Sequence, residues 1–153
     1  MPRVTVTVEV LSEVTGETVE AFARLIPQLS RSAPPPDHAG ISRVVGCPSN
    51  NVLVAREAGG GAPGRIVGML TLVIFPIPTG VRAWIEDVVT DEAARGQGVG
   101  TALTLEALRL AREAGVRTVD LTSRPARVAA GRLYEGLGFE RRDSRVYRYT
   151  IDA

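Results

Sequence analysis

The sequence predicts a mixed α/β (α+β) fold built around one mostly antiparallel sheet and about four helices. Residues 51–90 hold three apolar stretches separated by short Gly/Pro-rich segments, a pattern typical of antiparallel strands. Residues 98–114 carry apolar positions at helical spacing. The rest of the chain mixes helical and strand patterns, and a chain that mixes both is expected to pack helices against a sheet.

The N-terminal third has strand and helix patterns. Valines alternate with polar residues over 4–10, as in a half-buried strand, and Val19, Phe22, Ala23 and Ile26 follow helical spacing. We expect Pro27 to disturb the end of that helix, because proline lacks an N–H donor. The expected elements are a strand at 4–10, a helix at 15–29, a loop at 31–36 and a weaker helix at 37–45.

The central and C-terminal elements follow from the same patterns. Strands are expected at 51–57, 65–75 and 81–90, with turns at 58–64 and 76–80. Gly115 is expected to end the helix at 98–114, and Gly138 to form a left-handed cap after a helix at 125–137. A strand at 116–122 lies between these helices, and one or two strands are expected within 139–151.

Composition limits the class of protein. A chain of 153 residues is the usual size of one domain, so we expect a single domain over 1–153. The net charge of +1 is too small for a nucleic-acid partner. One cysteine and one histidine argue against a disulfide and against a metal site. No signal-peptide pattern and no apolar run of about 20 residues is present, so we expect a cytoplasmic protein without a membrane partner.

Residues 88–101 (VVTDEAARGQGVGT) carry the main chemical signal. A strand ends, and glycines at 96, 98 and 100 lead into the amphipathic helix. We expect these glycines to adopt positive φ and to let a ligand approach the backbone. The free N–H groups and the dipole of the helix N-terminus suit a pyrophosphate.

The same loop has three other interpretations. The glycines can simply form a turn. A dinucleotide-binding fold requires a third glycine where Thr101 stands, although Asp120 lies about 20 residues further, as that fingerprint requires. A P-loop is excluded, because the chain has no lysine.

Two motifs resemble one family. Arg95-x-x-Gly98-x-Gly100 resembles the Q/R-x-x-G-x-G/A motif of the GNAT superfamily of N-acetyltransferases. A second stretch resembles that family's A-x-x-L-Y-E-x-x-G-F signature through Ala130, Leu133, Tyr134, Glu135, Gly138 and Phe139. The resemblance covers nearly the whole chain and is weakest over the first 50 residues. It implies the GNAT fold, in which the sheet splays after its fourth strand.

The resemblance also implies acetyl-CoA as co-substrate, and the residue counts above give no reason to expect a metal. The backbone of Val88, Val89 and Thr90 would pair with the pantetheine arm. Many relatives carry an asparagine where this chain has Arg127, which can reach a coenzyme phosphate or point into solvent. The pyrophosphate would lie against the loop residues Arg95, Gly96, Gln97, Gly98, Val99, Gly100 and Thr101.

Tyr134 matches the family tyrosine that faces the coenzyme sulfur. A phenol with a pKa of about 10 can donate a hydrogen bond to a departing thiolate whose conjugate thiol has a pKa of about 8.5. The alternative is that Tyr134 is only a packed aromatic on its helix.

The general base is expected to be Glu86, with Asp87 or a route through water as alternatives. Strict alternation along the strand predicts that Glu86 shares its face with Trp84, Val88 and Thr90. Either carboxylate can instead form an ion pair with an arginine.

The predicted activity is direct transfer of an acetyl group from acetyl-CoA to a primary amine. A small-molecule acceptor is favoured over a peptide, because the chain lacks an obvious acidic groove. The alternatives are a protein or peptide N-acetyltransferase and a non-catalytic acyl-CoA sensor or scaffold, with a nucleotide-dependent oxidoreductase as a distant third. Tyr147 and Tyr149 alternate on the last expected strand, and a homodimer through the sheet edge or terminal strands is compatible with this pattern.

Overall fold

The computed structural model describes residues 5–58 and 63–152. The chain divides into two compact units, Met1–Leu121 and Thr122–Ala153. Val4 of the first expected strand and residues 59–62 of the expected glycine-rich turn lie outside the described residues.

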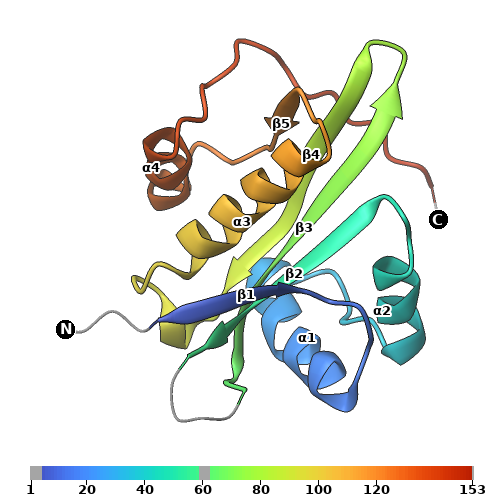
Figure 1. Ribbon diagram of the computed structural model, residues 1–153, viewed down its shortest axis with the longest axis vertical. Coiled ribbons are helices and arrows are strands. Elements are labelled where there is room, and N and C mark those ends of the chain that lie inside the picture. The colour runs from blue at the N-terminus through green and yellow to red at the C-terminus, as the bar shows by residue number, and fades with distance from the viewer. Residues whose placement is uncertain (1–4, 59–62, 153) are drawn as a thin grey trace. The chain divides into compact units, whose positions relative to one another are not determined.

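The first unit contains one five-stranded mixed sheet (Figure 1). Its strand order is β1-β2-β3-β4-β5. Strands β1 to β4 pair with one another in antiparallel fashion, and β5 is parallel to β4. The predicted mixed α/β fold is therefore confirmed. The strands are β1 (Val6–Val10), β2 (Asn50–Glu57), β3 (Ile66–Ile77), β4 (Gly80–Thr90) and β5 (Thr118–Asp120).

Local capping explains where the first two helices begin. Helix α1 (Gly16–Leu29) starts at a capping box in which Thr15 and Thr18 bond each other's backbone N–H groups. It contains Pro27 and ends two residues later, so the expected disturbance is confined to its last turn. Helix α2 (His38–Val45) starts at Asp37, whose carboxylate accepts the N–H of Gly40 at 2.8 Å.

Both faces of the sheet are covered by helices (Figure 1). On one face α1 and α2 pack over alternate residues of the strands, among them Val52, Val54 and Met69. The intervening residues of β2, Leu53 and Ala55, are fully buried on the opposite face, which α3 (Val99–Glu113) covers. The loop from β4 to α3 therefore crosses from the strand to the α3 face at one end of the sheet.

The β3–β4 hairpin and strand β5 have boundaries that differ from expectation. Strand β3 continues to Ile77, and β4 begins at Gly80, so the expected turn at 76–80 is shorter. Gly80 permits this tight turn because its φ is +137°. Strand β5 is limited to three residues instead of 116–122, since only these pair with β4.

The second unit contains helix α4 (Val128–Gly136), so the described residues hold the four predicted α-helices. Gly138 follows its end with φ +100°, which confirms the predicted left-handed cap. The strands expected within 139–151 are wrong for the described chain, which has no strand there. Alternation shows only that a segment suits a sheet, and a strand also needs a hydrogen-bonded neighbour; here Tyr147 and Tyr149 are 88% and 87% exposed.

Among the described residues, no helix combines the length and the apolar character that crossing a bilayer requires.

Candidate active site

The C-terminal half of β4 has a free edge. Strand β5 pairs with β4 only at Arg82, Ala83 and Trp84, whereas pairing with β3 continues to Thr90. From Ile85 onward, β4 therefore has a strand partner on one side only within the described residues. Its N–H and C=O groups on the other side can bind an extended ligand through main-chain hydrogen bonds. Val88, Val89 and Thr90 all lie on this stretch.

A β-bulge interrupts β4 at the two predicted carboxylates. Thr71 lies opposite Glu86, but Met69 lies opposite Val89, so β4 has one extra residue between these pairs. Asp87 has φ +50°, the only positive φ among the described non-glycine residues. Such a conformation costs roughly 1–3 kcal/mol and is often found at functional sites.

The bulge corrects the face predicted for Glu86. Met69 and Thr71 point to the same face of β3, so their partners Val89 and Glu86 also share a face. Thr90 pairs with Gly68 on the opposite face, the one covered by α3. Glu86 therefore shares its face with Trp84 and Val89 rather than with Thr90, on the side of the sheet that carries α1 and α2. Glu86 and Asp87 are both exposed.

The backbone N–H groups of the loop after β4 fall into two sets, one hydrogen-bonded within the protein and one without a protein acceptor. A short 3-10 helix, η1 (Glu92–Ala94), follows Asp91, and every backbone N–H from Asp91 to Arg95 donates to an acceptor in the protein. Within the described part of the chain, no such acceptor is found for the N–H groups of residues 96–101. Six consecutive donors, which we call the open N–H groups, thus lack a protein acceptor, and they belong to the predicted binding residues from Gly96 to Thr101. All of these residues are exposed or half-buried except Val99, which is buried.

The glycines have a geometry that suits the approach of an anion. Gly96 and Gly98 have φ +78° and +83°, and Gly98 is the N-cap of α3 without any side-chain cap. A Cβ at either position would meet nothing within 4 Å, so the backbone faces open space there. The expectation for Gly100 was wrong: it lies in the first turn of α3, and its φ is not positive. The first N–H groups of α3 and its dipole favour a bound anion.

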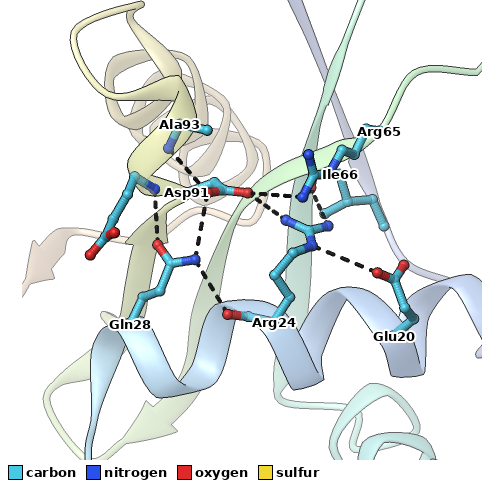
Figure 2. A network of polar contacts seen from close by, with 8 residues as sticks. Glu20, Arg24, Gln28, Arg65, Ile66, Asp91 and Ala93 are labelled. Carbon is cyan, nitrogen blue, oxygen red and sulfur yellow. Dashed lines mark hydrogen bonds and ion pairs between the residues drawn. The ribbon is translucent and has the colours of Figure 1, made fainter.

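A polar network holds the start of this loop (Figure 2). The carboxylate of Asp91 accepts hydrogen bonds from Arg24 Nη1 at 2.5 Å and from the N–H of Ala93 at 3.1 Å. Gln28 Oε1 accepts the N–H of Glu92 at 2.9 Å. Burial alone would raise the pKa of Asp91, but the N–H of Ala93, the Gln28 amide and the Arg24 guanidinium outweigh it and lower that pKa. Asp91 is therefore ionised at neutral pH.

The beginning of α3 packs closely on the sheet. A Cβ built on Gly68 would lie 2.6 Å from Val99 Cγ1 and 3.1 Å from Leu103 Cδ1. Val99 and Leu103 are both buried, and Thr104 Oγ1 donates to the carbonyl of Gly100 at 2.7 Å. The last three of the open N–H groups, those of residues 99–101, therefore belong to a helix whose first turns are fixed against β3.

Tyr134 and Arg127 lie in the second unit. Tyr134 is on α4, and its ring makes an edge-on contact with Phe139 at a centroid distance of 5.6 Å. Burial raises the pKa of the Tyr134 phenol, and the positive charge of Arg127 opposes this shift only in part. Arg127 precedes α4 as its N-cap, and its side chain makes no capping bond. Their approach to the loop of the first unit stays a prediction.

A strand edge followed by a short loop and an uncapped helix N-terminus suits a long ligand with an extended arm and a phosphate group. The sequence of residues 22–139 matches the model of the acetyltransferase (GNAT) family. The chain belongs to this family and is a GNAT N-acetyltransferase.

Similar proteins of known name are consistent with membership of this family. A glucosamine 6-phosphate N-acetyltransferase of Trypanosoma brucei brucei is 43% identical over 79 residues, which are 50% of this chain and 52% of that protein. The match thus spans about half the length of this curated relative. A crystal structure of a Trypanosoma brucei acetyltransferase has a TM-score of 0.75 and 28% identity, covering 96% of this chain and 100% of that one. An aminoglycoside acetyltransferase from an uncultured soil metagenomic sample has the same fold, with a TM-score of 0.82 and 20% identity over 96% of this chain and 97% of that one.

Sequence reasoning did not find the residues that support the loop. Arg24 and Gln28 are one turn apart on α1, but nothing in the sequence indicates that they meet Asp91. Gly68 did give a signal, because an isolated glycine inside an apolar strand indicates a close approach of another element. Nothing in the sequence predicts the positive φ of Asp87, except that aspartate is one of the residue types that tolerate this conformation.

Proposed function

We propose that this enzyme transfers an acetyl group from acetyl-CoA to a primary amine of a small molecule. The observation that carries the proposal is the pair of unpaired main-chain segments that follow one another in the chain: the edge of β4 up to Thr90, and the N–H groups of residues 96–101 beyond the bonded residues 91–95. An extended pantetheine arm suits the strand edge, and a pyrophosphate suits the glycine loop. Arg95 and Arg127 are the side chains proposed to add positive charge for the phosphates.

The proposed reaction is a direct transfer within one ternary complex. The amine nitrogen attacks the thioester carbonyl carbon, a tetrahedral oxyanion forms, and the carbon–sulfur bond breaks as the amide forms. A main-chain N–H near Val88 would stabilise the oxyanion. Holding the amine and the thioester together supplies much of the rate.

Tyr134 is the proposed proton donor to the departing thiolate. Its phenol is protonated at neutral pH, since the ordinary pKa of a tyrosine is about 10 and burial raises the pKa of Tyr134 further. A protonated phenol can give its proton, or a strong hydrogen bond, to the leaving sulfur, and the hydroxyl then recovers a proton from solvent.

Glu86 is the proposed acceptor of the amine proton, directly or through one water. It is exposed, and it lies beside the bulge on the face of the sheet that carries α1 and α2. Asp87 is the alternative base, since it is also exposed and is placed by the bulge itself.

Small amines are the proposed acceptors, and amino sugars are the first to test. The support is the curated relative named for glucosamine 6-phosphate, which is 43% identical over half of this chain. The acceptor groups themselves come from loops that vary within a fold, so the relative indicates a class and not a single compound.

The test begins with calorimetric titration of acetyl-CoA, with NADH as a parallel control. Saturable binding of acetyl-CoA that is lost in Gly98→Glu supports the donor site, whereas no binding, or tighter binding of NADH, contradicts it. Thiol release is then followed with glucosamine 6-phosphate, glucosamine, amino acids, polyamines and a peptide. Acetylation of the peptide alone would contradict the small-molecule class, and binding without any thiol release would favour a non-catalytic acyl-CoA module.

A further inference from the structure

The loop that carries the open N–H groups is joined to α1 through a network of buried and half-buried side chains. Arg24 and Gln28 are four residues apart, so they project from one side of α1. Both reach Asp91, the residue between β4 and the loop (Figure 2). Asp91 is 5% exposed, and its side chain lies among cations: Arg24 at 2.5 Å and Arg65 at 3.7 Å.

Each side chain of this network also forms a hydrogen bond with a backbone group. Arg24 Nη2 donates to the carbonyl of Ile66 at 2.9 Å, which fixes the guanidinium on β3. Asp91 Oδ1 accepts the N–H of Ala93, and Gln28 Oε1 accepts the N–H of Glu92. The two N–H groups at the start of η1 are therefore bonded by side chains and not by the turn itself. Gln28 bonds this turn directly, and Arg24 bonds it through the carboxylate of Asp91, so the start of η1 is joined to α1.

We propose that Arg24, Gln28 and Asp91 are positioning residues for the donor: by joining η1 to α1, they hold the open N–H groups of residues 96–101 in the arrangement that binds the pyrophosphate of acetyl-CoA. The inference rests on the proposed function, which supplies the ligand. Anion binding by several N–H groups requires their positions to be fixed to within about 0.5 Å and their directions to within about 10–20°. The bonded residues 91–95 supply that constraint on one side of the open donors, and α3 supplies it on the other.

The chain offers a matched control for Arg24. Arg56 also joins α1 to the sheet, through Glu17 at 2.8 Å and Glu9 at 2.7 Å, and it also donates to a backbone carbonyl, that of Gly64. The side chains of Arg24 and Arg56 are 20% and 15% exposed. The two arginines thus have similar structural roles, but none of the contacts of Arg56 involves the loop.

The experiment measures acetyl-CoA binding by calorimetry and thermal unfolding for the wild type, Arg24→Gln, Asp91→Asn and Arg56→Gln. We expect Kd for acetyl-CoA to rise about tenfold in Arg24→Gln and Asp91→Asn, because small displacements of binding groups have large effects. Arg56→Gln should keep Kd within about twofold of the wild type while losing thermal stability comparable to that of Arg24→Gln. Equal Kd values in all four proteins, or an equal loss in Arg56→Gln, would overturn the inference.

Two further variants separate positioning from general loss of structure. Gln28→Met removes the amide and leaves the ion pair of Arg24 and Asp91 in place, and it should raise Kd about threefold. In the double variant Arg24→Gln/Asp91→Asn, Kd should rise no more than in the worse single variant, because the two residues act as one unit. Additive losses would contradict this. A wild type that does not bind acetyl-CoA would instead refute the proposed function.

Discussion

Gly68 of β3 lies directly against Val99, the first residue of α3, and a Cβ on the glycine would come within 2.6 Å of Val99 Cγ1. The strand and the helix meet so closely only because the strand residue has no side chain. This contact places the start of α3, and with it the open N–H groups of the candidate donor site.

Replacing Gly68 by alanine should therefore destabilise the protein and weaken acetyl-CoA binding together. The added methyl group must push against Val99 and Leu103, and overpacking of this kind costs about 1–3 kcal/mol. Urea unfolding and calorimetric titration measure the two effects. Gly131→Ala is the control: a Cβ at this position in α4 meets nothing within 4 Å, so it should stabilise the protein by about 0.5–1 kcal/mol. Unchanged binding in Gly68→Ala would show that the start of α3 tolerates displacement.

The positive φ of Gly98 provides a test of the loop itself. Gly98→Ala should cost about 1–2 kcal/mol of stability, because an L-residue is strained at φ +83°. It should also weaken acetyl-CoA binding, since the methyl group occupies the open space from which the ligand approaches. Gly115 has φ +73° at the other end of the same helix. Gly115→Ala should lose similar stability and keep acetyl-CoA binding unchanged; loss of binding in both variants would contradict the assignment.

Tyr134→Phe tests the proton donor. We expect kcat to fall about 100-fold, while Kd for acetyl-CoA stays within about twofold, because only the phenolic proton is lost. Since burial raises the pKa of Tyr134, the loss of wild-type activity through its ionisation should begin above the ordinary value of about 10. Tyr149, which is 87% exposed, supplies the control variant Tyr149→Phe. Full activity in Tyr134→Phe would exclude the proposed role.

Glu86→Gln and Asp87→Asn distinguish the two candidate bases. If Glu86 accepts the amine proton, Glu86→Gln should lower kcat about 100-fold at neutral pH and leave acetyl-CoA binding intact. Asp87→Asn should keep most of the activity, because asparagine also tolerates the φ of +50° that the bulge requires. The opposite result would assign the base to Asp87, and little change in either variant would favour proton transfer through water alone.

The sequence predicted those features of the fold and of the candidate site that depend on residues close together in the chain. The glycine loop is one continuous segment, so its residue types and spacing were sufficient to recognise it. The face of Glu86 was predicted wrongly, because alternation assumes a regular strand and the bulge at Asp87 adds one residue. The contact between Arg24 and Asp91 joins positions 67 apart in the chain. Tertiary packing brings them together, and no local pattern contains that information.

The ionisation of Asp91 predicts how stability depends on pH. Its folded-state pKa is lowered: burial opposes this, and the N–H of Ala93, Gln28 and Arg24 outweigh it. A carboxylate with a lowered folded-state pKa stabilises the folded protein above its unfolded pKa of about 3.9, and this contribution is lost as the pH falls through the folded value. The wild type should therefore exceed Asp91→Asn in unfolding free energy at pH 5–7, and the difference should shrink below about pH 4. Urea unfolding across this range measures it. Glu106→Gln is the control, because Arg109 lowers the pKa of Glu106 on the surface of α3, where solvent weakens the ion pair and the pH-dependent difference should be smaller. A difference for Asp91→Asn that does not vary with pH would show that the ion pair with Arg24 contributes nothing through its charge.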